Sequence, residues 1–80
     1  MATYIPLDKP AQGNIETPLT LTALQTFVGG FIKFVDLSSG DILIANEAGP
    51  AFAAVNQTAS AMAGRPIHGH VVLASPQEIA

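Results

Sequence analysis

The chain has 80 residues, 49% of them hydrophobic, and its mean hydropathy of +0.40 is high for the single small domain expected over residues 1–80. It contains no cysteine, which excludes a disulfide framework, a thiol nucleophile and a cysteine zinc site. With three basic residues and a net charge of −3, it lacks the basic stripe that nucleic acids require, so no nucleic-acid polymer is expected as a partner.

The opening residues, MATYIPLDKP, carry no basic segment followed by an apolar core, so no signal peptide is expected. No apolar run approaches the roughly 18 residues of a membrane span. We therefore expect a cytoplasmic protein without a membrane partner.

Two short strands are predicted first. Residues 4–7 form the first, and Pro6 within it cannot donate to a ladder, so a position at the edge of the sheet is expected. A turn by composition follows, and residues 15–16 are predicted to return as the second strand.

A helix is predicted over residues 21–28. Thr20 is its expected N-cap, because a hydroxyl can accept from the free amides of a first helical turn. Leu21, Leu24 and Val28 follow at i, i+3 and i+7, which places them on one apolar stripe.

Two glycines, Gly29 and Gly30, follow this helix. Gly29 stands where a helix end adopts positive φ, and Gly30 lets the chain turn into a strand. The alternative is a ligand-binding loop, but phosphate-binding glycine loops precede a helix rather than follow it. We therefore interpret both glycines as structural.

A hairpin is predicted from two strands, residues 31–37 and 41–46, joined by a turn at residues 38–40. Both strands are apolar on both faces over part of their length. This indicates a central position in the sheet, or one face covered by helix and the other by a second subunit. Gly49 is expected in the turn that leaves the hairpin.

A second, shorter helix is predicted over residues 57–63. Asn56 is its expected N-cap, and Gly64 is expected to end it. The spacing of Ala59 and Met62 predicts that both face the core.

The last predicted strand covers residues 67–73, where His68 and His70 alternate with apolar positions. Ser75 and Glu78 then form a capping box that announces one further helical turn. Together the elements predict an α+β fold: a small, mainly antiparallel sheet of four or five strands, one main helix and a second short helix.

Several motifs in order, TLTALQTFVGGFIKF, NEAG, Asn56 with Ala59, and IHGHVVL, resemble the domain-of-unknown-function family 3846, which is carried by bacteriophages, mobile elements and bacteria. The resemblance covers about residues 19–80 and implies a bacterial host cell, but no activity, because the family has no settled one. Lys33 departs from the family pattern, in which an acidic residue is frequent. The matching positions are Leu21, Leu24, Gln25, Val28, Gly29, Gly30, Ile32, Asn46, Glu47, Gly49, Asn56, Ala59, Ile67 and Gly69.

The two histidines are the first candidate site. His68 and His70 would lie on the same face of one strand, because side chains alternate with period two. Two imidazoles can hold a metal only with a third and usually a fourth ligand, and the chain has no other histidine and no cysteine. We therefore expect no metal or other cofactor, and a solvated or interfacial histidine pair.

A polar trio is the second candidate. Asn46 and Glu47 close a strand and could reach a pocket with Asn56, where amide and carboxylate groups would read the edges of a base or a sugar. The alternative is that these side chains hydrogen-bond the backbone of turns, as short polar residues at strand ends commonly do. Lys33 and Arg65 are the cations that could meet the phosphates of such a ligand.

No nucleophile, base and orienting group can be assembled from these residues, so an enzyme is not expected. The hypothesis is a non-catalytic binding module of viral or mobile-element origin. In its sharpest form it is a counter-defence protein that sequesters a signalling nucleotide or a host protein. The alternative is a structural protein that acts by self-association, and a small hydrolase is less favoured.

A homo-oligomer is also expected. Phe31 and Phe34 are three residues apart and Val71 and Val72 are adjacent, so the apolar residues must occupy both faces of the sheet. One short helix covers only one face, and the open face would associate through itself or through an edge strand. The alternative is that residues 53–62 fold back over the second face, which would leave a monomer.

Overall fold

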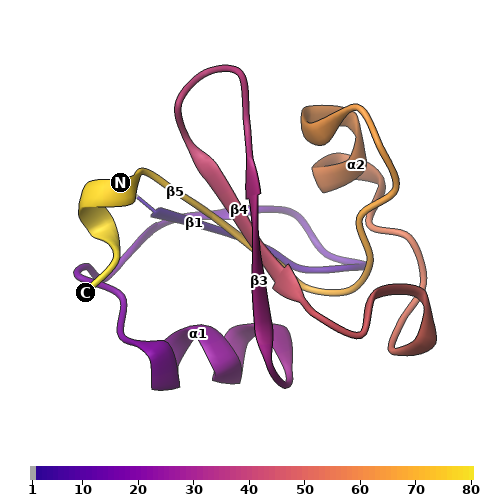
Figure 1. The fold of residues 1–80 in the computed structure, drawn as a ribbon, viewed down its shortest axis with the longest axis horizontal. Helices are drawn as coiled ribbons and strands as arrows, with labels where there is room; N and C mark the ends of the chain where they lie inside the picture. Colours follow the sequence, from indigo (N-terminus) through magenta and orange to yellow (C-terminus); the bar gives the residue numbers. More distant parts are fainter. Residues whose placement is uncertain (1) are drawn as a thin grey trace.

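The computed structural model describes residues 2–80, which form an α+β fold with one five-stranded sheet and two α-helices, as the sequence predicts (Figure 1). Two short 3-10 turns complete this part of the chain. The strands are β1 (Ala2–Ile5), β2 (Gln12–Ile15), β3 (Ile32–Asp36), β4 (Ile42–Asn46) and β5 (Val71–Ala74); the helices are α1 (Leu21–Val28) and α2 (Gln57–Ala63); the 3-10 turns are Gly49–Ala51 and Pro76–Glu78.

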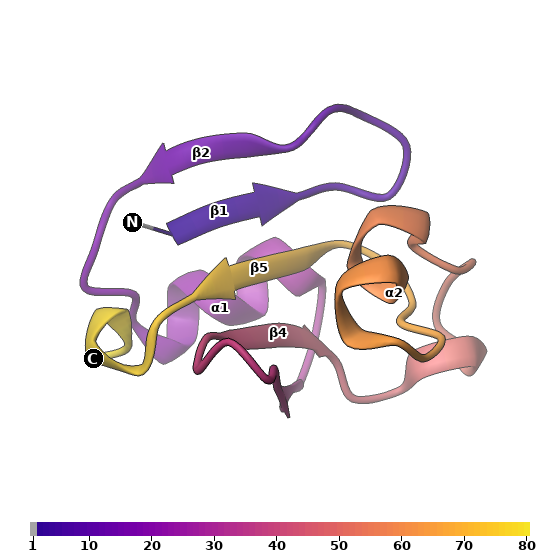
Figure 2. The same ribbon diagram turned by 90° about the horizontal axis from the view of Figure 1, so that it is seen from above.

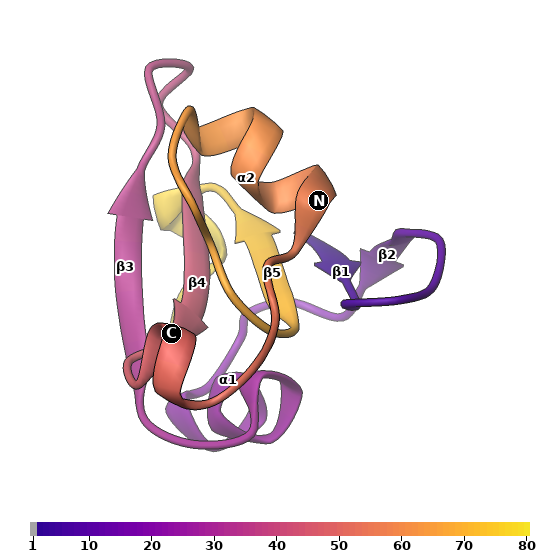
Figure 3. The ribbon, with the colours of Figure 1, turned by 90° about the vertical axis from the view of Figure 1, so that its right-hand side faces the viewer.

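The strand order is β2-β1-β5-β4-β3, and all neighbouring strands are antiparallel (Figure 3). The two hairpins, β1–β2 and β3–β4, are local in sequence. The last strand, β5, lies between them and pairs with β1 on one side and β4 on the other. The central strand of the sheet is therefore the last of the five strands in sequence.

The expected edge position of the first strand is wrong. β1 pairs with both β2 and β5, so it lies inside the sheet. Pro6 is compatible with this position because β1 ends at Ile5, and the missing N–H of proline therefore falls outside the ladder. The second strand also starts earlier than predicted, at Gln12.

The last strand is shorter than the predicted residues 67–73. Gly69 has φ +78, a left-handed conformation that interrupts an extended strand. Its N–H donates to the carbonyl of Ala54 at 3.0 Å, and His68 forms an isolated bridge with Val55. Residues 67–69 therefore pair with residues 54–56 before α2, and the sheet strand begins at Val71.

Helix α1 has the predicted ends. The Thr20 hydroxyl accepts from the backbone N–H of Ala23 at 3.1 Å, and Gly29 ends the helix in the left-handed conformation with φ +83. Leu24 and Val28 are buried, but Leu21, which the same stripe includes, is 58% exposed. The helix therefore packs on one face of the sheet from Leu24 onward, and its first residue stays in solvent.

The first core lies between α1 and the sheet. Its buried members come from the sheet, from the helix and from the segment before it: Ala2, Leu19, Leu24, Val28, Ile44, Val72 and Ala74. Tyr4 and Phe27 pack at its margin with ring centroids 4.9 Å apart.

The second core lies on the opposite face, where α2 packs (Figure 2). Ala59 is fully buried there, but Met62 is 46% exposed, so the predicted core position of Met62 is wrong. The second face is thus covered by the fold-back of the segment that ends in α2, as the alternative to an open face predicts. The buried members of this core are Ile5, Val35, Leu43, Ala45, Ala59, Ile67 and Val71.

The predicted turn at Ser75 is present as the 3-10 turn Pro76–Glu78. The Glu78 carboxylate accepts from the backbone N–H of Ser75 at 2.9 Å, and this bond holds the pKa of that carboxyl below its usual range. No helix within residues 2–80 has both the length and the apolar character needed to cross a membrane.

Candidate functional site

Asn46 is buried at the end of β4, and both ends of its side chain are used by the fold. Its Nδ2 donates to the carbonyl of Val28 at 3.2 Å, and its Oδ1 accepts from the N–H of Ala48 at 2.8 Å. A Cβ on Gly30 would lie 3.0 Å from this Nδ2, so glycine is needed there for the close approach. Asn46 therefore links the end of α1 to the turn after β4. This agrees with the alternative in which its side chain hydrogen-bonds the backbone rather than a ligand.

Asn56 is also buried, and its side chain makes three hydrogen bonds. The Oδ1 atom caps α2 by accepting from the N–H of Ala59 at 3.1 Å. The Nδ2 atom donates to the carbonyls of Ile5 at 3.0 Å and Gly69 at 2.9 Å. One side chain thus joins α2, the end of β1 and the segment before β5, and it has no donor left for a ligand.

The polar trio does not form one pocket. Asn46 and Asn56 are each hydrogen-bonded to separate parts of the backbone. Glu47 is exposed, and its backbone N–H donates to the carbonyl of Phe31 at 2.8 Å. Of the three, only Glu47 presents its side chain to solvent.

The two histidines contact different elements. His70 Nδ1 accepts from the backbone N–H of Leu7 at 2.9 Å, so its neutral ring carries the proton on Nε2. His68 Nδ1 lies 2.9 Å from the carbonyl of Ala53, which can only accept, so this nitrogen carries a proton. Opposite tautomers and separate partners do not favour joint binding of a metal. Residues 2–80 contain no group of three or more candidate metal ligands.

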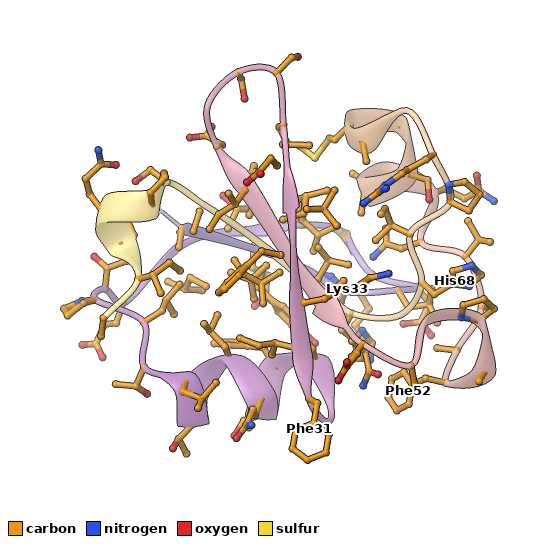
Figure 4. All side chains as sticks on the ribbon, in the orientation of Figure 1. Phe31, Lys33, Phe52 and His68 are labelled. Atoms are coloured by element: carbon orange, nitrogen blue, oxygen red, sulfur yellow. The ribbon has the colours of Figure 1, made fainter. Side chains whose placement is uncertain are left out.

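The two candidate cations are both exposed. Lys33 is the second residue of β3 and lies well apart from His68 in Figure 4. Arg65 follows the left-handed Gly64 that ends α2. The structure does not place Lys33 or Arg65 in either of the two surface depressions described below.

One depression of about 380 Å³ lies where α1 ends and β3 begins. Phe31 and Phe52, which project at the same end of the molecule in Figure 4, form two of its walls, and Asn46 and Glu47 lie beside them. We call it the aromatic depression. Its lining residues are Gly29, Gly30, Phe31, Asn46, Glu47, Ala48 and Phe52.

Phe52, which the sequence reading missed, is held in place by two glycines. A Cβ on Gly29 would lie 2.9 Å from the tip of its ring, and one on Gly69 would lie 3.4 Å from its side. The ring therefore rests on bare backbone while 45% of the side chain stays exposed. No local pattern identifies it, because the two glycines are far from it in sequence; its only signal is a large aromatic residue within an alanine-rich loop.

A second depression of about 320 Å³ lies beside β1. It contains one candidate residue, His70, whose Nε2–H remains available because Nδ1 is occupied by Leu7. We call it the polar depression. Its lining residues are Tyr4, Pro6, Asp8, Lys9, Gln12 and His70.

Comparison with known proteins adds no relative. No family model, no curated protein and no solved structure matches the chain.

Proposed function

We propose that the chain is a non-catalytic binding module that captures a protein partner by receiving one apolar side chain in the aromatic depression. The observation that carries this proposal is the exposure of aromatic residues around it. Phe31 is 74% exposed and Phe52 45% exposed, although the chain has only four phenylalanines and two compact cores to fill. Large aromatic residues left on a surface beside a hollow are typical of interaction sites.

The chemistry of the rim favours a basic neighbour on the partner. Glu47 is exposed beside the depression, whereas the polar ends of Asn46 are occupied by backbone groups. The net charge of −3 and the pI of 4.9 also attract a basic surface. The expected ligand is therefore an apolar side chain adjacent to lysine or arginine.

The cellular setting of this proposal comes from the resemblance to domain-of-unknown-function family 3846. A phage or mobile-element protein in the cytoplasm of a bacterial host meets host proteins in large excess. Capture of one of them without catalysis is a form of counter-defence that suits a chain of this size. Binding at the aromatic depression does not depend on this cellular setting, and photo-crosslinking tests the depression alone.

Photo-crosslinking from single positions tests the proposal. We expect benzoylphenylalanine at Phe31 or Phe52, in the full chain expressed in a bacterial cell, to give the same protein adduct. We expect Glu47→Lys to reduce that adduct several-fold, because it reverses the charge at the rim. The matched control is the probe at Leu21, which is 58% exposed on α1 and lies outside the depression. The same adducts from Leu21 as from Phe31, or no effect of Glu47→Lys, would overturn the proposal.

The polar depression favours a second candidate function, capture of a small polar ligand such as a signalling nucleotide. Tyr4, Gln12 and His70 supply a ring and hydrogen-bonding groups, and Lys9 supplies one cation beside Asp8. We expect ADP-ribose or a cyclic dinucleotide to raise the melting temperature by several degrees, and Lys9→Ala to abolish the rise. An unchanged melting temperature at millimolar ligand would remove this candidate and leave the first one intact.

A further inference from the structure

Strand β3 is a regular strand at the open edge of the sheet. It pairs with β4 over all five of its residues without a register shift. Within residues 2–80, no other strand or helix lies beyond it on its outer side (Figure 3). The open edge therefore presents the backbone of β3 to solvent.

The register with β4 identifies which backbone groups point outward. At its two ends, the N–H of Glu47 donates to the carbonyl of Phe31 and the N–H of Leu37 donates to that of Asp41. Hydrogen-bonded pairs alternate along an antiparallel ladder, so the odd-numbered residues of β3 bond to β4. The N–H and C=O groups of Ile32, Phe34 and Asp36 consequently face the open edge.

We propose that this edge binds a second copy of the chain, so that two β3 strands pair antiparallel about a two-fold axis that passes beside Phe34. Phe34 then lies opposite Phe34 of the second copy, and Ile32 lies opposite Asp36. All the outward backbone groups of the strand are satisfied in this arrangement, and the two sheets become one. The exposed Phe34 side chain, 54% accessible in the single chain, gains an aromatic partner across the axis.

Symmetry and charge select this register. A two-fold axis perpendicular to the sheet keeps each face on its own side, so paired residues must be both even or both odd. If one β3 strand is shifted by two residues along the other in the first direction, Lys33 lies opposite Lys33 of the second copy. Like charges directly opposite each other are unfavourable. If the strand is shifted by two residues in the opposite direction, Ile32 lies opposite a residue outside β3 and has no strand partner. The register centred on Phe34 avoids both losses.

The proposal does not depend on the proposed function. The aromatic depression lies at the start of β3, so the pair would carry two depressions at opposite ends of the joined strands. Failure of partner capture would leave the pairing unaffected, and a monomeric chain could still capture a partner.

Light scattering on the full chain is the first test. We expect twice the chain mass of 8.2 kDa at tens of micromolar protein. Phe34→Lys should raise the dissociation constant by at least about tenfold, because it removes the aromatic pair and opposes two cations. The control Leu21→Lys, at a site with similar exposure on α1, should leave the mass unchanged. A mass of 8.2 kDa for the unaltered chain throughout the micromolar range would overturn the proposal.

Single cysteines test the register, because the chain has none of its own. A hydrogen-bonded antiparallel pair has Cα atoms about 5.5 Å apart, within the range that a disulfide spans. We expect Phe34→Cys to form a disulfide-linked dimer on mild oxidation, and Lys33→Cys and Asp36→Cys to form none. A mixture of Ile32→Cys and Asp36→Cys should form the mixed dimer. Efficient cross-linking of Lys33→Cys, or none of Phe34→Cys in a chain that is dimeric by mass, would overturn this register.

Discussion

The two helices have similar lengths and similar ends, but they are attached to the sheet in different ways. Helix α1 has eight residues and α2 seven, and each has a polar N-cap and a left-handed glycine at its end. Helix α1 buries Leu24 and Val28 against the sheet, whereas the only fully buried residue of α2 is Ala59. The side chain of Ala59 is a single methyl group, which removes little apolar surface from water. Apolar burial by α2 itself therefore attaches this helix only weakly.

Hydrogen bonds compensate for this small apolar contact. The N-cap of α2, Asn56, is buried and also binds the backbone of β1 and of the segment before β5. The hydroxyl of Ser60, one turn later, accepts from the N–H of Ile67 at 2.8 Å and donates to the carbonyl of the same residue at 3.2 Å. The N-cap of α1, Thr20, is exposed and its side chain makes one such bond, to Ala23. Helix α1 is therefore attached to the sheet mainly by apolar packing, whereas the attachment of α2 depends more on the hydrogen bonds of Asn56 and Ser60.

Removal of the Asn56 side chain is the strongest test of this difference. We expect Asn56→Ala to lower the free energy of unfolding by about 3–5 kcal/mol, because it removes a helix cap and leaves two buried carbonyls without donors. A domain of this length has a total stability of only about 4–12 kcal/mol. Urea denaturation followed by circular dichroism measures the change.

The variant Asn56→Ser separates the two roles of this residue. A serine hydroxyl can keep the cap to Ala59 but cannot reach both carbonyls, so we expect a loss between those of Asn56→Ala and the unaltered chain. If Asn56→Ala costs no more than about 1 kcal/mol, the ordinary value of a helix cap, the polar attachment of α2 is wrong.

The glycines that end the helices provide the next test. Gly29 and Gly64 both have positive φ, but a Cβ would lie 2.9 Å from the Phe52 ring at Gly29 and would meet nothing within 4 Å at Gly64. We expect Gly64→Ala to cost about 1 kcal/mol from left-handed strain, and Gly29→Ala about 2 kcal/mol from strain and contact together. Thermal and urea unfolding of the two variants measure the difference.

A double-mutant cycle identifies the source of the extra loss. In a Phe52→Ala background, Gly29→Ala should cost no more than Gly64→Ala, because the ring that it would meet is gone. Equal losses at the two glycines in the unaltered background would show that Phe52 moves aside freely. The aromatic depression would then lack the rigid wall that a binding site requires.

The helix caps, the helices and the hairpin turn were predictable because each depends on residues that are close together in the sequence. Thr20, Gly29, Asn56 and Gly64 all occupy the positions that local spacing assigns to them. The strand order was not predictable, because the place of β5 between the hairpins depends on contacts between the two ends of the chain.

The candidate site was predicted only in part, because it too depends on contacts between residues that are far apart in the sequence. Asn46 and Asn56 are both buried and hydrogen-bonded, but their amide groups donate to carbonyls far away in the sequence rather than to a ligand. The spacing of Ala59 and Met62 placed both on one side of the helix. It could not show that the buried part of α2 is limited to Ala59, so the core position predicted for Met62 was wrong. Phe52 escaped notice because the glycines beneath it lie elsewhere in the sequence.

The exposed N-cap of α1 should matter less than the buried one of α2. Thr20→Ala removes one hydrogen bond to Ala23 at the surface, so we expect a loss of about 1 kcal/mol. Water can replace the lost acceptor there, which it cannot do at Asn56. The ratio of the losses for Asn56→Ala and Thr20→Ala, measured in the same buffer, is the most direct comparison of the two helices. A ratio near one would mean that burial of the cap contributes nothing.

Met62→Lys should have the smallest effect. Met62 is 46% exposed on α2, so lysine there can extend into water and keep its aliphatic stem on the helix, and we expect a change within about 0.5 kcal/mol. The matched variant Ala59→Lys, three residues earlier at a fully buried position, should unfold the second core. If Met62→Lys instead costs more than about 1 kcal/mol, its side chain is covered in solution by something other than its own chain. Light scattering of that variant then decides the matter, because a simultaneous fall to the mass of one chain would place the contact between copies at α2 rather than at β3.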